Sequence, residues 1–478
     1  MKVKFSKGAV TCKQLAEWSG GVLRHDRGAD LLIDGICTDS READETTAFC
    51  ALRGERADGH DYIENVLAAG CRCILCEQSS PALEQQSDAA AIVVKDTEFS
   101  LARLANGYGR QIPFRGVGVT GSVGKTTTKE MIASVLGQAW RTYKTAGNHN
   151  SLVGMPLSML EIPQDCEWAV LEMGMSGFGE IERLSVAAEP EIAVITNIGS
   201  SHMEMLGSRK NICRAKLEIL SGLRDSGALI LNGDEPLLSR VGGKSYRTLY
   251  VSLERENVAF YAKNIRVENG YTLFDLVWEQ GLVRDLRINV MGKHNVYAAA
   301  FAFAVGAVSG MQVEDIRAGL LGFAAEGLRQ NMTVCGDWIF FEDCYNASPE
   351  SMNAALEVLQ TYCKRTSRRS VAVLGDMLEL GTQSSEMHRS VGAAAAKMGI
   401  DLLITLGARG RQIAYGARHA GLDRVLELDL TDQESCNRVA DVLWTQLTSD
   451  DAILFKASRG MGVERVIEAL KRRSDSVK

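Results

Sequence analysis

The sequence predicts an α/β protein of three domains, and two observations support this prediction. Its 478 residues are too many for a single hydrophobic core. Over most of the chain, short apolar strands alternate with amphipathic helical segments, which is typical of largely parallel sheets with helices on their faces. Shifts in this pattern place the domains at residues 1–96, 97–323 and 324–478.

The first domain is expected to be a small α/β domain. Residues up to 96 mix short strands with turns, and residues 91–94 have the apolar character of a buried strand. Cys71, Cys73 and Cys76 have a spacing that suggests zinc, but they lie in an apolar run and no fourth ligand follows nearby. Small buried side chains are therefore favoured over a metal site.

The central domain is expected to contain a mainly parallel sheet. Its predicted strands are residues 116–119, 168–173, 192–196 and 228–232. Residues 261–289 alternate apolar and polar side chains, which predicts a small antiparallel excursion. Residues 298–308 are apolar on all sides but too few to span a membrane, so they are interpreted as a buried helix.

The third domain repeats the alternation of strands and helices. Its predicted strands are residues 371–374, 402–406, 425–428 and 453–455. Helical patterns at residues 349–363 and 384–398 separate them. This order predicts a Rossmann-like, doubly wound sheet.

Composition excludes several functional classes. A formal net charge of −7 gives no basic excess for general nucleic-acid binding. No segment resembles a signal peptide, and no apolar run is long enough to insert into a membrane. The 12 cysteines follow no disulfide-module spacing, so a cytoplasmic protein is expected.

The most informative segment is Val-Gly-Val-Thr-Gly-Ser-Val-Gly-Lys-Thr-Thr-Thr at residues 117–128, which joins a strand to a helix. Glycines let backbone N–H groups surround phosphate oxygens, and the helix N-terminus adds positive potential. Lys125 can reach the outer phosphates, and the Thr126 hydroxyl can hold Mg²⁺. The segment predicts a P-loop for a nucleoside triphosphate, although valine stands at position 119, where the strict motif has its first glycine. The residues expected to contact the nucleotide here are Thr120, Gly121, Ser122, Val123, Gly124, Lys125, Thr126 and Thr127.

Polar residues also follow the next two predicted strands along the chain. Glu172 ends a predicted strand, where its carboxylate can complete a Mg²⁺ site with Thr126. His202 comes shortly after the next strand, and it can ligate metal, orient a phosphate or be structural. Residues 174–179 contain three glycines, but their spacing favours a flexible turn over a dinucleotide site.

Two further residues are ambiguous when taken alone. Lys216 lies on a helical pattern and has the character of an ordinary surface lysine. Asn295 opens the alanine-rich helix, where it can be an N-cap or can present its amide to a base.

With these motifs in place, the chain resembles the Mur ligases, the ATP-dependent amide-bond ligases of peptidoglycan assembly. The resemblance covers essentially the whole chain. It is carried by Lys-Thr-Ala-Gly-Asn-His-Asn-Ser-Leu-Val-Gly-Met-Pro-Leu at residues 144–157, Gly-Asp-Met-Leu-Glu-Leu-Gly at residues 375–381 followed by His388, and Leu-Phe-Lys-Ala-Ser-Arg-Gly at residues 454–460.

The resemblance implies catalytic roles for several residues. Lys125 would neutralise the β and γ phosphates of ATP, and Arg329 the γ phosphate. Thr126 and Glu172 would hold one Mg²⁺, and His202 a second. Lys216 would complete the catalytic set. It would carry a carbamate formed with CO₂, which would bridge the metals as a carboxylate does.

It also implies how the substrates are held. Asn295 would contact adenine and Asp343 the ribose, with Tyr345 and Asn346 nearby. The uridine-nucleotide substrate would contact Ser40, Arg41, His60, Gly147 and Asn148.

The implied activity joins D-alanyl-D-alanine to a UDP-N-acetylmuramoyl-tripeptide through an acyl phosphate, with ATP and two Mg²⁺ ions, in a cytoplasmic monomer. Three alternatives stay open: a sibling ligase that adds the third stem residue, a folylpolyglutamate synthetase, and a nucleotide-binding regulator that has lost catalysis. The third stem residue itself, lysine or diaminopimelate, is also open.

Overall fold

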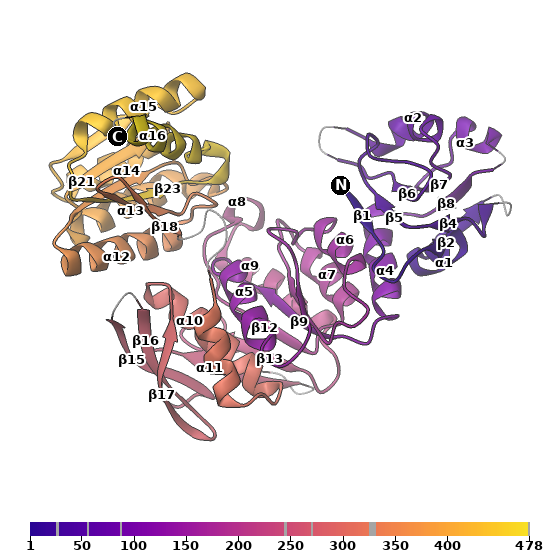
Figure 1. The fold of residues 1–478 in the computed structure, drawn as a ribbon, viewed down its shortest axis with the longest axis horizontal. Coiled ribbons are helices and arrows are strands. Elements are labelled where there is room, and N and C mark those ends of the chain that lie inside the picture. The colour runs from indigo at the N-terminus through magenta and orange to yellow at the C-terminus, as the bar shows by residue number, and fades with distance from the viewer. Residues whose placement is uncertain are drawn as a thin grey trace.

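The computed structural model describes residues 1–24, 28–54, 57–86, 88–242, 246–268, 271–324 and 331–476. These residues form three main α/β units, each built around its own sheet, and Figure 1 shows the first and third units on either side of the central one. The α/β fold with three domains is confirmed. The positions of the domain boundaries stay a prediction.

The N-terminal sheet has the order β1-β5-β6-β7-β8-β3, in which β5 to β8 are parallel and the two edge strands are antiparallel to their neighbours. Cys73 and Cys76 lie in β7, so their segment is a buried strand as expected. The elements are β1 Lys2–Lys4, β2 Val10–Thr11, α1 Cys12–Ser19, β3 Val22–Arg24, β4 Leu32–Ile33, β5 Gly35–Cys37, β6 Thr47–Cys50, α2 Ile63–Ala68, β7 Cys73–Cys76, α3 Pro81–Gln85 and β8 Ala90–Val93.

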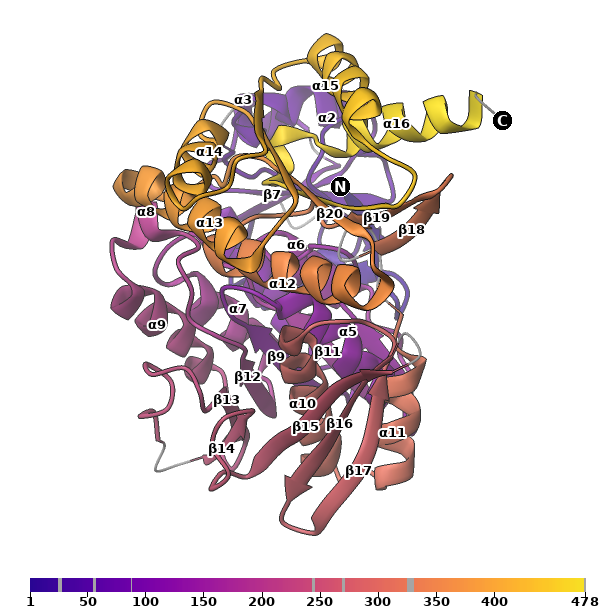
Figure 2. The same cartoon turned by 90° about the vertical axis from the view of Figure 1, so that its left-hand side faces the viewer.

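The central sheet has the order β10-β11-β9-β12-β13-β14-β15-β16-β17. It is parallel from β10 to β15, and β15, β16 and β17 form the antiparallel excursion expected near residues 261–289. Figure 2 shows these three strands extending away from the rest of the unit. The strands are β9 Arg115–Thr120, β10 Thr142–Lys144, β11 Trp168–Glu172, β12 Ile192–Ile195, β13 Ala228–Asn232, β14 Arg247–Ser252, β15 Phe260–Glu268, β16 Tyr271–Trp278 and β17 Gly281–Ile288.

Helices cover both faces of this sheet. Successive strand residues point to opposite sides, so neighbouring residues of one strand pack against different helices. Val170 and Val194 pack in the core beneath α5, α10 and α11, whereas Ala169 and Ile195 pack in the core beneath α4, α6, α7 and α9. The expected buried helix at residues 298–308 is confirmed as part of α10. The helices are α4 Thr97–Gly109, α5 Lys125–Leu136, α6 Gly154–Leu160, α7 Glu180–Ala188, α8 Met203–Leu206, α9 Arg209–Leu217, α10 Lys293–Val308 and α11 Val313–Gly322.

The third sheet has the order β18-β19-β23-β20-β21-β22 and is parallel except for the β18–β19 hairpin. Helices α12 to α14 cover one face and α15 and α16 the other, which confirms a doubly wound arrangement. The elements are β18 Asn331–Cys335, β19 Trp338–Glu342, α12 Pro349–Thr366, β20 Arg369–Leu374, α13 Ser384–Met398, β21 Leu402–Leu406, α14 Gly410–His419, β22 Val425–Leu428, α15 Gln433–Gln446, β23 Asp451–Lys456 and α16 Glu464–Ser476.

Candidate active site

The glycine-rich turn joins β9 to α5 at the carboxyl edge of the central sheet. Gly121 has φ 151° and Gly124 has φ 83°, conformations that a side chain would strain. Asn197, in the segment after β12, accepts hydrogen bonds at its Oδ1 from the N–H groups of Ser122 at 3.1 Å and Val123 at 2.9 Å. Lys125 donates to the Gly121 carbonyl at 2.9 Å, so its ammonium lies over the loop. The turn is therefore a rigid, electropositive cradle, as a phosphate loop requires.

Three buried oxygen atoms in or beside this cradle have no hydrogen-bond partner among the described residues. They are the Ser122 Oγ in the turn, the Thr126 Oγ1 at the start of α5 and the Glu172 Oε2 at the end of β11. The other carboxylate oxygen of Glu172 accepts a hydrogen bond from Asn150 Nδ2 at 2.7 Å. Because buried polar atoms are nearly always satisfied, these orphaned oxygens indicate a ligand, and the carboxylate among them favours a ligand that supplies positive charge.

His202 lies near the third domain. It has a left-handed backbone, with φ 63°, and its Nδ1 is 3.0 Å from Glu379 Oε2. Glu379 comes from the segment after β20, and its hydrogen bond with His202 lowers the pKa of the carboxyl group. The imidazole therefore borders the cavity described below and also contacts the third domain through Glu379.

Lys216 is buried on α9, with an exposed fraction of 1%. The interpretation as a surface lysine is therefore wrong. Burial lowers the pKa of its amine far below the usual value, and the nearby Lys125 ammonium lowers it further. Both effects favour the uncharged form of the amine. It does not line the large cavity described below.

Asp343 and its neighbours follow β19 in the third domain. Lys456, at the end of β23, is 2% exposed and lies 2.6 Å from Asp343 Oδ2. The same ammonium donates to the Asn346 carbonyl at 3.0 Å. Arg459 lies over the Tyr345 ring, 5.2 Å from its centroid. Lys456 thus holds this loop in place. The sequence analysis gave this lysine no role of its own, because only the fold brings β23 beside β19.

Asn295 is not the N-cap of α10. Gly292 occupies that position, and Asn295 donates from Nδ2 to the Met291 carbonyl at 2.7 Å. Its side chain is buried and borders the cavity.

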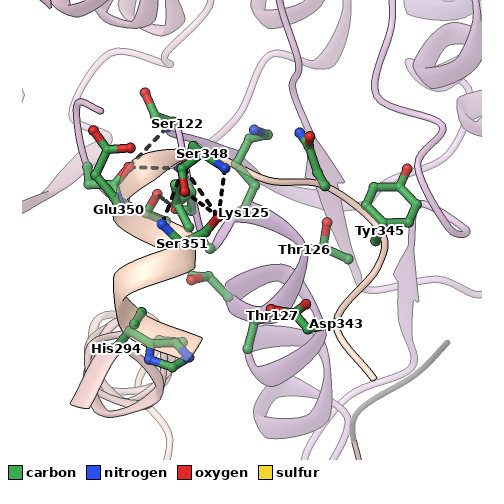
Figure 3. A pocket seen from close by; sticks show the side chains of 18 of the residues that line it. Ser122, Lys125, Thr126, Thr127, His294, Asp343, Tyr345, Ser348, Glu350 and Ser351 are labelled. Carbon is green, nitrogen blue, oxygen red and sulfur yellow. Dashed lines mark hydrogen bonds between the residues drawn. The ribbon is translucent and has the colours of Figure 1, made fainter. Parts of the chain in front are cut away.

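The central and third domains also meet at the start of α12. Ser348 caps this helix, and Glu350 in its first turn accepts hydrogen bonds from Ser200, at 3.0 Å from the N–H group and 2.9 Å from the hydroxyl. Figure 3 shows Ser348, Glu350 and Ser351 opposite the end of α5 that carries Lys125. The sequence held no signal for this contact.

These elements enclose a cavity of about 850 Å³ between the two domains. It gathers most of the predicted nucleotide and metal residues at one place. The predicted residues that line it are Ser122, Val123, Gly124, Lys125, Thr126, Thr127, Asn148, Glu172, His202, Asn295, Asp343, Tyr345 and Asn346. Thr120 and Gly121 do not line it, and Arg329 falls outside the described residues.

The residues predicted for the uridine nucleotide do not line this cavity, apart from Asn148. Arg41 is exposed and pairs with Asp39, with 2.6 Å between Nη2 and Oδ2. His60 accepts a hydrogen bond at Nε2 from the Glu77 N–H at 2.9 Å, and its Nδ1 is 2.6 Å from Asp58 Oδ1. His60 therefore braces its own loop, while the side chain of Arg41 reaches solvent near Ser40.

Two of the motifs that carry the resemblance interlock in the third domain. The Asp376 carbonyl accepts a hydrogen bond from the Ser458 N–H at 3.0 Å, and Ser458 Oγ accepts one from the Leu378 N–H at 2.9 Å. His388 is fully buried and accepts a hydrogen bond at Nε2 from the Met377 N–H at 3.0 Å. This network holds the segment that presents Glu379 to His202.

Comparison with known proteins agrees with this arrangement. Models of the Mur ligase middle domain, the Mur ligase glutamate ligase domain and the Mur ligase family catalytic domain match residues 119–306, 330–459 and 32–108. A Bacillus subtilis (strain 168) protein named UDP-N-acetylmuramoyl-tripeptide–D-alanyl-D-alanine ligase is 39% identical over 465 residues, which cover 96% of this chain and 98% of the relative. The chain belongs to the Mur ligase family.

Solved structures extend the likeness of this Mur ligase to the whole fold. A crystal structure of MurF from Acinetobacter baumannii has a TM-score of 0.87 at 31% identity, covering 97% of this chain and 99% of that chain. The MurF ligase from Thermotoga maritima in complex with ADP has a TM-score of 0.82 at 28% identity, covering 93% and 98%. The predicted family is confirmed. Among the described residues, no helix is long and apolar enough to cross a membrane.

Proposed function

We propose that this Mur ligase uses ATP to join D-alanyl-D-alanine to UDP-N-acetylmuramoyl-tripeptide, giving UDP-N-acetylmuramoyl-pentapeptide, ADP and phosphate. The observation that carries the proposal is the interdomain cavity. There the phosphate loop of the central domain and the Asp343–Asn346 loop of the third domain face one space. The likeness to ligases with this named activity over nearly the full chain supports the same assignment.

The reaction needs two steps because a carboxylate does not condense with an amine unaided. The tripeptide carboxylate attacks the γ phosphorus of ATP, and ADP leaves as an acyl phosphate forms. The amine of D-alanyl-D-alanine then attacks the acyl carbon, loses a proton and expels phosphate. The first step brings two anions together, so Lys125 and the N-terminus of α5 stabilise it by neutralising charge where it develops.

Thr126 and Glu172 fit a divalent cation, because both present orphaned buried oxygens and Mg²⁺ prefers oxygen ligands. Bound there, Mg²⁺ would supply positive charge beside the triphosphate. His202 would join a second ion after exchanging its contact with Glu379. Arg329 would add a further positive charge at the γ phosphate.

Lys216 is the proposed carbamate. An uncharged amine adds to CO₂ and releases one proton, leaving an N-carboxylate, and burial favours the uncharged form of this lysine that the addition requires. The modification turns a potential cation into an anion beside Lys125. A carboxylate at this depth would balance the charge of the phosphate-binding lysine and serve as a further oxygen ligand.

The experiment that tests the function is phosphate release with each substrate omitted in turn. We expect release to require ATP, the UDP-linked tripeptide and D-alanyl-D-alanine together. Replacement of the dipeptide by single amino acids, or of the UDP-linked tripeptide by folates, separates the sibling ligases. Strong release with either of those replacements would contradict the proposal. A protein that binds ATP but makes no product with any pair would be the regulator.

We propose that Asp343 contacts the ribose of ATP, and Asp343→Ala tests this role. The KM for ATP is expected to rise about five- to tenfold, because one hydrogen bond is lost far from the reacting atoms. The KM values of the other substrates should change less. Glu342→Gln is the control, because the neighbouring Glu342 pairs with Lys471 and does not line the cavity. An unchanged KM for ATP would contradict the ribose contact.

We also place the reaction in the cytoplasm. All 12 cysteines are free and buried, which is consistent with a reducing compartment.

A further inference from the structure

A second lysine on α5 is buried in the molecule and takes no part in the chemistry above. Lys129 lies four residues after Lys125, and its side chain has an exposed fraction of 0%. The ammonium donates to the Thr145 carbonyl at 2.7 Å and to the Gly147 carbonyl at 3.2 Å. A buried ammonium is costly unless it is paired and hydrogen-bonded, so these contacts hold both partners firmly.

Two carboxylates complete the surroundings of this ammonium. Glu130 Oε1 lies at 3.0 Å, and Glu172 Oε2, one of the three cavity oxygens without a hydrogen-bond partner, lies at 3.8 Å. Glu130 also pairs with Lys144 at its other oxygen. The four side chains form a row of alternating charge, in which Lys129 contacts both carboxylates.

The carbonyls that Lys129 holds belong to the loop after β10, which carries Asn148 to the cavity. This loop is also tied to the end of β11. The Glu172 N–H donates to Thr145 Oγ1 at 3.2 Å, and Asn150 Nδ2 donates to Glu172 Oε1 at 2.7 Å. The loop and the carboxylate therefore share two direct links, and Lys129 joins both to the helix that starts at the phosphate loop.

We propose that Lys129 is a positioning residue, which fixes the Gly147–Asn148 segment for the uridine-linked substrate in register with Glu172 and α5. This inference rests on the proposed function. With both carbonyls turned toward the ammonium, the segment keeps one conformation in which Asn148 faces the cavity. Without the ammonium, two inward carbonyls and two carboxylates lose their shared donor. The links of Thr145 and Asn150 to Glu172 remain, but Gly147 loses the contact that fixes its carbonyl.

The test is Lys129→Met, which keeps the length of the side chain and removes its charge. Calorimetric titration with UDP-N-acetylmuramoyl-tripeptide, without ATP or Mg²⁺, should show binding about tenfold weaker or more. In the ligation assay the KM for this substrate should rise, while the KM for D-alanyl-D-alanine stays within about twofold. A residue that acted only through stability would lower the active fraction and leave both KM values unchanged.

Lys144→Met is the matched control, because it removes a positive charge from the same row and leaves the Thr145 and Gly147 carbonyls bonded to Lys129. Its affinity for the substrate should stay within about threefold of the wild type. Equal losses in the two variants would overturn the inference, since general charge would then explain both. Wild-type affinity in Lys129→Met would overturn it as well.

If Lys129→Met does not fold, the double variant Lys129→Met/Glu130→Gln keeps the net charge of the row and should show the same selective loss. Failure of both variants to fold would overturn the inference, because Lys129 would then act through overall stability. Wild-type protein that ligates normally while Lys129→Met binds normally disproves this inference alone. Wild-type protein that neither binds the substrate nor ligates disproves the proposed function with it.

Discussion

Lys216→Ala is expected to lower the rate of pentapeptide formation by about 10²–10³-fold or more, the loss typical when one charged group is removed from a reacting centre. The variant lacks the amine that would be carboxylated, and a small apolar side chain cannot replace an anion beside Lys125. ATP should still dock on the phosphate loop. Product formation under saturating substrates, followed by chromatography, measures the effect.

Added formate or acetate should restore part of the activity of Lys216→Ala, because a small carboxylate can enter the space that the side chain leaves. Lys210→Ala is the control: Lys210 is exposed on the first turn of the same helix, and its removal should leave the rate unchanged. Ligation by Lys216→Ala at the wild-type rate would show that no carbamate is needed.

Lys125→Met should lower kcat/KM for ATP by about 10²–10³-fold, equivalent to roughly 3–4 kcal/mol of lost transition-state stabilisation. The ammonium lies over the loop, bonded to the Gly121 carbonyl, so its charge faces the site of the phosphates. Initial rates at varied ATP and calorimetric binding of ADP measure the two parts of the loss. Binding of the UDP-linked tripeptide without ATP should be unaffected. A kcat/KM within about threefold of the wild type would contradict the assignment of Lys125 to the phosphates.

Much of the fold could be predicted because most strands of the parallel sheets are short, largely apolar runs. The predicted strands at residues 228–232, 402–406 and 425–428 match β13, β21 and β22 without shift. Strand β14 was missed, since its partly exposed sequence lacks such a run. Periodicity also could not show that the antiparallel strands join the central sheet, because strand order depends on contacts between distant segments.

Candidate site residues could be predicted where they lie close together in the sequence. They were harder to predict where distant segments bring them together. The phosphate loop lies within one strand–turn–helix unit, so its residues could be identified together. Lys456 pairs with Asp343, and Glu350 accepts a hydrogen bond from Ser200. The two residues of each pair are more than a hundred positions apart in the sequence. No spacing rule contains such pairs. Lys216 was misjudged from its residues alone, because its burial depends on how α9 packs.

The geometry of Gly121 limits how this protein can change under selection by a drug. A Cβ at this position would come within 1.8 Å of Thr196 Oγ1, so even alanine would collide with the neighbouring strand end. The loop surface here is made by backbone atoms whose position no side-chain replacement can adjust cheaply. An inhibitor that depends on the backbone conformation of this loop would therefore meet few resistance substitutions at Gly121.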